Sequence, residues 1–159
     1  MAVSAAHHFD CSLDGAVDRL CDSRFTIARG GHALNSQLPQ RLLSWAGHAL
    51  SWLHAPLELH LIRYEAMKSD PIPIFRGALR FLGLEHDDRA IGAALERCRI
   101  DRLQRLEAEQ RFRETPRHAT RFFRRGVVGE GLERLTPEQI ERLDTMKRRV
   151  DRAIRERLA

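Results

Sequence analysis

Apolar residues recur every three to four positions along most of the chain. The pattern covers two pieces of the first 21 residues, and then residues 39–54, 71–83, 87–106 and 137–158. This spacing places apolar side chains on one face of an α-helix, so each segment is predicted to be helical. Ser12 is a predicted N-cap, Pro39 is placed in a first helical turn, and Gly83 is a predicted helix stop. Thr136–Gln139 form a capping box before the last helix, and Arg29–His32 are a predicted break.

One segment shows a different period. Leu57, Leu59 and Leu61 alternate with polar residues up to Tyr64, which predicts a β-strand. A single strand cannot form a sheet, because its N–H and C=O groups need partners when they are buried. A helix–strand–helix order with one apolar strand is what remains when a parallel α/β sheet is cut. We therefore expect residues 1–159 to form one partial α/β domain, mostly helical with one core parallel strand, completed by another copy or by a longer chain.

Composition favours a folded, soluble protein. Hydrophobic residues make up 43% of the 159 residues and charged residues 31%, which suffices for a buried core. No apolar run approaches the ~18 residues of a membrane span, and no leader pattern follows Met1. Cys11, Cys21 and Cys98 include no CxxC pair, and with His7–His8 they match no compact zinc spacing. We expect reduced thiols, no metal and a cytoplasmic location.

The positive charge is local. The net charge is +5, while residues 111–159 alone carry fourteen basic and eight acidic side chains. Arginine dominates residues 111–129, and its planar guanidinium suits a bidentate grip on phosphate or sulfate. Glycines in the same stretch predict a loop. Arg124 and Arg125 precede Gly126, so side chains and backbone can converge on one anion.

Ser4 is a second candidate for anion binding. Its hydroxyl lies at a predicted helix start, beside backbone N–H groups that have no partner within the helix. The alternative is that Ser4 only caps that helix.

Several short segments occur in the order and spacing of a known family. They are Met1–Ser4, Trp45 and Trp52 ahead of the strand, LIRYEAMKSDP at 61–71, FLGL at Phe81–Leu84, Arg124-Arg125-Gly126 with Val127–Glu130, and Thr136–Gln139. Together they resemble the C-terminal part of the PAPS-dependent sulfotransferases, where PAPS is 3′-phosphoadenosine 5′-phosphosulfate. The resemblance implies a partial P-loop-like sulfotransferase domain that lacks the N-terminal half of its sheet.

The resemblance also implies a function and site residues. Such transferases move a sulfuryl group from PAPS to an acceptor hydroxyl or amine. Ser4 and the loop residues Arg124, Arg125 and Gly126 would bind the donor's 3′-phosphate, and Tyr64 would pack beside its adenine. The alternative for Tyr64 is simple packing at a strand end. The implied partners are the nucleotide donor and an acceptor, with no metal and no membrane.

Departures from the family pattern limit the expected chemistry. The sequence has no counterpart of the family's phosphate loop, with its lysine, or of its catalytic histidine. The arginine of the 3′-phosphate segment would precede Met1, Cys98-Arg99-Ile100 replaces Thr-Ser-Phe, and Gly131 replaces a tryptophan. We expect a truncated C-terminal half with no catalytic residue, inactive by itself.

Two other functional classes fit parts of the sequence. The arginine cluster and the pI of ≈ 9.8 suit a nucleic-acid-binding protein. Against this stand the near-neutral first 110 residues, the low aromatic content and the absence of a helix-turn-helix or RRM-like signature. The other class is a non-catalytic interaction module, which would associate with itself or another chain through the open strand edge.

Overall fold

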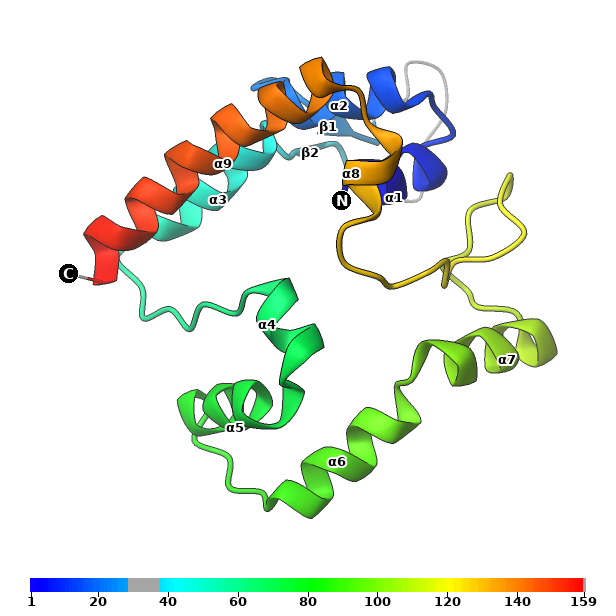
Figure 1. The fold of residues 1–159 in the computed structure, drawn as a ribbon, viewed down its shortest axis with the longest axis vertical. Helices are drawn as coiled ribbons and strands as arrows, with labels where there is room; N and C mark the ends of the chain where they lie inside the picture. Colours follow the sequence, from blue (N-terminus) through cyan, green and yellow to red (C-terminus); the bar gives the residue numbers. More distant parts are fainter. Residues whose placement is uncertain (29–37, 159) are drawn as a thin grey trace. The chain divides into compact units, whose positions relative to one another are not determined.

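The computed structural model describes residues 1–28 and 38–158, which fall into two compact units. The first unit combines Met1–Leu57 with the chain from Glu130 onward, and the second is Glu58–Gly129. The first contains α1 (Ala2–His8), α2 (Leu13–Cys21), β1 (Thr26–Ile27), β2 (Gln40–Arg41), α3 (Trp45–Leu53), α8 (Glu130–Arg134) and α9 (Pro137–Leu158) (Figure 1). The second contains α4 (Tyr64–Ser69), α5 (Pro71–Phe81), α6 (Asp88–Arg97) and α7 (Ile100–Gln110). The predicted break at Arg29–His32 lies outside the described residues.

The first unit is built around α9. This helix lies beside α3 and also packs on α2 (Figure 1). The apolar residues buried between α3 and α9 are Ala46, Leu53, Met146, Val150, Ala153 and Ile154. The predicted capping box is confirmed, because Thr136 N donates to Gln139 Oε1 (3.0 Å) and Gln139 N donates to Thr136 Oγ1 (3.2 Å). At the other end, Arg157 donates to the carbonyl oxygen of Leu57 (2.8 Å).

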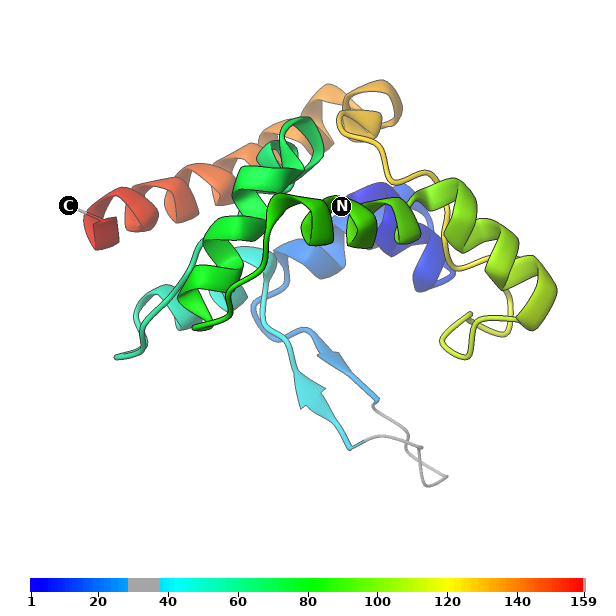
Figure 2. The same cartoon turned by 90° about the horizontal axis from the view of Figure 1, so that it is seen from below.

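The helix predicted from Pro39 begins later, at Trp45. Gln40 and Arg41 instead form β2, which pairs antiparallel with β1 (Figure 2). Leu43 follows with a positive φ of 64°, a conformation that cannot belong to a right-handed helix. Ser44 is the N-cap, and its Oγ accepts a hydrogen bond from Gly47 N (3.1 Å). The pairing of β2 with β1 and the cap at Ser44 together explain why the helix begins at Trp45 and not at Pro39.

The second unit consists of short helices with little buried surface. Ile91 is the only buried residue between 58 and 129, a range that the structure describes throughout. Asp87 caps α6 by accepting from Ala90 N (2.7 Å). Gly83, with φ +68°, ends α5 in a Schellman motif, in which Leu84 N donates to Leu79 O (2.9 Å). The predicted stop at Gly83 is therefore confirmed.

The predicted core strand at 57–64 is absent. Residues 58–63 form neither helix nor strand, and Tyr64 begins α4. Within the described residues the strands form a single two-stranded antiparallel sheet, β1–β2, so the expected core parallel strand is wrong for this chain. His60 stacks on Phe81 of α5 (ring centroids 5.5 Å apart), whereas Leu59 and Leu61 are 37% and 45% exposed. A strand needs a neighbouring strand to pair its N–H and C=O groups, and no strand in the described residues pairs with residues 58–63. The expectation of a mostly helical chain is confirmed.

Candidate functional site

The arginine-rich loop, residues 111–129, is the candidate site. It follows α7 in the second unit and, as predicted, contains no helix or strand. In Figure 1 it is the yellow to gold segment between α7 and α8. Its arginines are Arg111, Arg113, Arg117, Arg121, Arg124 and Arg125. Because a loop lacks the backbone hydrogen bonds of a helix or sheet, its conformation depends on side chains elsewhere.

Two side chains of α7 hold the loop backbone. Gln104 Nε2 donates to the carbonyl oxygens of Phe123 (3.0 Å) and Arg124 (2.6 Å). The Glu107 carboxylate accepts from the amides of Phe122 and Phe123, the latter at 3.1 Å. It also accepts from the hydroxyl of Thr115 (2.8 Å). The peptide groups immediately before Arg124 and Arg125 are thereby tied to a helix.

Three phenylalanines pack inside the loop. Phe112 lies 4.8 Å from Phe122 and 5.0 Å from Phe123, measured between ring centroids. Phe122 and Phe123 meet edge to face at 5.3 Å. Aromatic pairs at these separations are favourable. The loop therefore has a small apolar cluster that brings its first residues beside those preceding Arg124.

Gly126 lies against the first turn of α7. Its φ of +60° favours glycine, and a Cβ at this position would lie 3.6 Å from Cδ1 of Ile100. Ile100, Gln104 and Glu107 share one face of α7, since their spacing is i, i+4 and i+7. They meet the loop in reverse order, Ile100 at Gly126 and Glu107 at Phe122. Residues 122–126 therefore run alongside α7 in the opposite direction.

Glu107 is held in its charged form. Partial burial acts to raise its pKa, but the hydrogen bonds from Phe122, Thr115 and Phe123 and the charge of Arg121 lower the pKa below its ordinary value. The carboxylate thus stays ionised at neutral pH and accepts all three hydrogen bonds at once.

The predicted site residues are distributed over both units. Arg124, half-buried, and the exposed Arg125 follow the tethered peptides, and Gly126 contacts α7. Tyr64 is the first residue of α4, also in the second unit, and is 43% exposed. Ser4 is an exposed residue of α1 in the first unit. Met1 is the N-cap of α1, so the alternative reading of Ser4 as a cap is wrong.

Sequence reasoning missed Gln104 and Glu107. Both are polar residues on the α7 face that begins with the apolar Ile100, at helical spacing from it. Polar residues that interrupt an apolar face and precede a loop rich in glycine and arginine are the signal that could have identified them. The pattern names no partner, however, because the contacts reach up to 20 residues along the chain.

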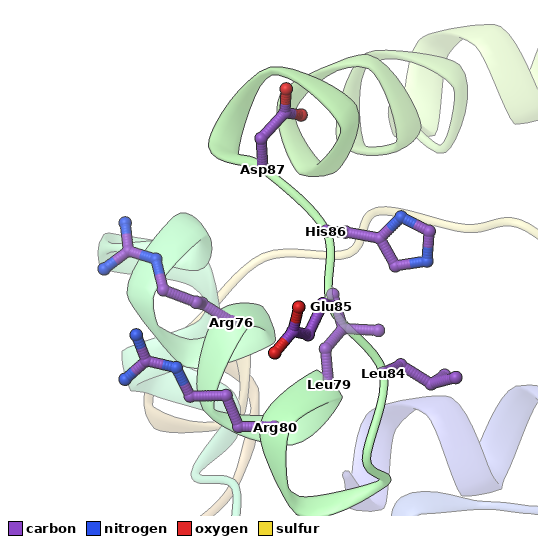
Figure 3. Close-up of a pocket in the computed structure, with 7 residues that line it drawn as sticks. All are labelled: Arg76, Leu79, Arg80, Leu84, Glu85, His86 and Asp87. Carbon is purple, nitrogen blue, oxygen red and sulfur yellow. The ribbon is translucent and has the colours of Figure 1, made fainter.

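A pocket of ≈ 410 Å³ lies elsewhere in the second unit, between the end of α5 and the start of α6 (Figure 3). Its lining residues are Arg76, Leu79, Arg80, Leu84, Glu85, His86 and Asp87. Arg76 is already paired with Asp88, to which it donates from Nε (2.9 Å) and Nη2 (2.5 Å). The two arginines are balanced by two carboxylates, and none of the predicted site residues lines this pocket.

Neither a metal site nor a membrane span is found in the part of the chain that the structure describes. No group of three or more His, Cys, Asp or Glu side chains within residues 1–28 and 38–158 is placed to hold a metal ion. None of the helices in the same residues has the length and apolar character needed to cross a bilayer. Cys11, Cys21 and Cys98 are free thiols, as expected.

Comparisons with known proteins identify the family. Cytosolic sulfotransferase 16 of Arabidopsis thaliana is 26% identical over 147 residues, covering 86% of this chain and 42% of the relative. Cytosolic sulfotransferase 17 of the same plant is 25% identical over 143 residues, covering 84% of this chain and 38% of the relative. For cytosolic sulfotransferase 1 the identity is 32% over 107 residues, 61% of this chain and 32% of the relative. The chain thus spans less than half the length of these relatives. No solved structure matches it significantly. The family model described as the sulfotransferase domain matches residues 3–154, and the chain therefore belongs to the sulfotransferase family.

Proposed function

We propose that this chain forms part of a PAPS-dependent sulfotransferase and binds the 3′-phosphate of the donor through its arginine-rich loop. The observation that carries the proposal is the tethering of residues 122–124 to α7, because it gives Arg124 and Arg125 a defined starting position. Preorganised cations bind an anion better than mobile ones, since less ordering is needed on binding. Membership of the sulfotransferase family supplies the class of ligand.

Each residue has a proposed role. The guanidiniums of Arg124 and Arg125 make charge-assisted hydrogen bonds to phosphate oxygens. Gly126 allows the φ of +60° with which the backbone turns directly after the two arginines. Ser4 and Tyr64 keep the roles that the family resemblance implies: Ser4 offers a hydroxyl to a phosphate oxygen, and Tyr64 packs beside the adenine ring. The acceptor supplies a hydroxyl or an amine.

We further propose that residues 1–159 transfer little or no sulfuryl group by themselves. In the reaction an acceptor atom attacks sulfur as the bond to the donor's 5′-phosphate breaks, while a base removes the acceptor's proton. This sequence contains no counterpart of the family's phosphate-loop lysine or catalytic histidine. The chain would therefore act as the C-terminal part of a larger domain. A cytosolic location is proposed from the names of the relatives.

Calorimetric titration with 3′-phosphoadenosine 5′-phosphate tests the site. The chain should bind this nucleotide more tightly than adenosine 5′-phosphate, which lacks the 3′-phosphate. Arg124→Ala and Arg125→Ala should each weaken binding by about 1–3 kcal/mol, while Arg113→Ala, in the same loop, serves as the control and leaves binding unchanged. No measurable affinity in the parent chain, or equal affinity for both nucleotides, would reject the proposal.

A second candidate function is an interaction module, and the exposed row of leucines favours it. Leu57, Leu59 and Leu61 are 50%, 37% and 45% exposed in a segment without a strand partner. Such a row can add to the edge of another sheet, including that of a second copy. Leu59→Lys with Leu61→Lys should abolish concentration-dependent association in analytical ultracentrifugation. Salt-dependent binding to duplex DNA would instead support the nucleic-acid alternative.

A further inference from the structure

We propose that Gln104 and Glu107 are positioning residues that latch the arginine-rich loop to α7 and so set its affinity for an anionic ligand. The latch itself stands on the contacts of these two side chains. Its consequence for binding rests on the proposed function of Arg124 and Arg125. Neither Gln104 nor Glu107 is proposed to touch the ligand.

The two side chains are chemically complementary to the loop backbone. An amide NH₂ can donate twice, and Gln104 uses it on two successive carbonyl oxygens, those of Phe123 and Arg124. A carboxylate only accepts, and Glu107 takes two successive amides, those of Phe122 and Phe123. The two side chains therefore bind both N–H and C=O groups within three consecutive residues, Phe122, Phe123 and Arg124. A carboxylate at position 104 would instead place acceptors against the two carbonyl oxygens, so a donating side chain is required there.

Glu107 also compensates charge. The loop carries six arginines, and among its own residues Glu114 is the only acid before Glu130. Arginines brought close together repel one another. Glu107 adds a negative charge from outside the loop, and Arg121 is the cation that acts on it. A carboxylate bound to the loop backbone therefore lowers the electrostatic free energy of the compact conformation, in which the arginines lie close together.

The latch would govern affinity because ordering costs free energy. A loop that is free in solution must lose backbone freedom when it closes on a phosphate. When Gln104 and Glu107 hold the loop, the loop loses this backbone freedom during folding, before the ligand binds. Loss of the latch should therefore weaken binding even though both guanidiniums are still present.

Limited digestion with trypsin measures the latch without any ligand, since the loop supplies its own cleavage sites. Glu107→Gln and Gln104→Leu should each speed cleavage after Arg121, Arg124 and Arg125 by roughly tenfold, because the loop opens more often. Hydrogen exchange at the amides of Phe122 and Phe123 should rise in parallel. The matched control is Glu109→Gln, an exposed residue of the same helix with the same change of charge, and it should behave like the parent.

Internal references show which part of the chain has opened. Cleavage after Arg102 and Arg105, within α7, should stay slow if only the latch is broken. Equal acceleration there would overturn the proposal, because Glu107 would then be stabilising the helix. Both tryptophans lie in α3, so unchanged tryptophan fluorescence shows that the first unit remains folded. Glu107→Asp keeps the carboxylate and should partly restore protection.

Nucleotide titration of the same variants separates the two proposals. Weaker binding of 3′-phosphoadenosine 5′-phosphate by Glu107→Gln, together with faster cleavage, supports the latch and its role. Faster cleavage in a chain whose parent binds no nucleotide supports the latch and rejects the proposed function. Parent-like cleavage by both variants overturns the latch, whatever the nucleotide result.

Discussion

The two units of this chain are stabilised in different ways. In the first unit, α3 and α9 bury a continuous apolar cluster that includes Met146 and Ile154. In the second unit Ile91 is the only buried residue, and the longest connection is held by hydrogen bonds from Gln104 and Glu107. The stabilising free energy from apolar burial grows with the buried area and depends little on the orientation of the groups. A hydrogen bond depends on the distance and angle between its atoms, and each one contributes less to stability.

The difference indicates where the protein is adaptable. A unit with little buried area opens locally at low cost, and ligand-binding segments are commonly found in such regions. The candidate anion site lies in the second unit, on its arginine-rich loop, while the first unit has the larger core. The proposed anion site would therefore be carried by the unit with less buried apolar surface. The following predictions test this contrast, beginning with the largest effect.

Removing core volume from the first unit should have the largest effect. Met146→Ala takes a buried side chain out of the cluster with α3 and should cost about 2–5 kcal/mol of unfolding free energy. Urea unfolding followed by tryptophan fluorescence measures this, because both tryptophans lie in α3. Arg149→Ala, exposed on the same helix, should change stability by less than about 0.5 kcal/mol. Similar losses in the two variants would refute a core-dominated first unit.

In the second unit, two glycines should respond with opposite signs. Gly126→Ala forces a side chain into a φ of +60° beside Ile100 and should destabilise the loop by about 1–2 kcal/mol. Gly92 lies inside α6 with open space around it, so Gly92→Ala should stabilise by about 0.5–1 kcal/mol. Hydrogen exchange in each segment reports the change. Stabilisation by Gly126→Ala would show that the loop does not hold this conformation.

Helix caps should contribute equally to the stability of both units, because a cap involves only residues close together in the chain. Ser12 accepts from Gly15 N (3.0 Å) in the first unit, and Asp87 accepts from Ala90 N (2.7 Å) in the second. Ser12→Ala and Asp87→Ala should each cost about 1 kcal/mol, with Ser12→Asn near neutral as the control. Hydrogen exchange within α2 and α6 measures the losses. A much larger loss in one unit would mean that its cap also carries tertiary contacts.

Acid should loosen the loop, which is the smallest effect. The pKa of Glu107 is lowered in the folded chain, so its stabilising contribution is complete above the ordinary glutamate pKa of about 4.3 and is lost as pH falls through the lowered value. Amide exchange at Phe122, corrected for the intrinsic pH dependence, should therefore increase below about pH 4.3. Glu107→Gln should abolish this response. A parent chain with no extra exchange in acid would contradict the assigned role of the carboxylate.

Local patterns predicted much of the helical structure. The cap at Ser12, the stop at Gly83 and the capping box at Thr136 are all confirmed, because each depends on residues within five positions of one another. The start of α3 was predicted too early, at Pro39, since the pairing of Gln40 with Ile27 is not local. The loop predicted from the glycines of the arginine-rich stretch is also confirmed.

The sequence by itself determined most of the helices, the local positive charge and the family, because helical periodicity, caps and short motifs depend on residues close together in the chain. It did not predict the short helices α4 and α8. Only the tertiary structure decided that residues 58–63 form no strand, since period-two spacing does not supply the neighbour that a strand requires. It also decided that Gln104 and Glu107 hold the loop, because a side-chain amide or carboxylate is compatible with many partners until the fold brings one within hydrogen-bond distance.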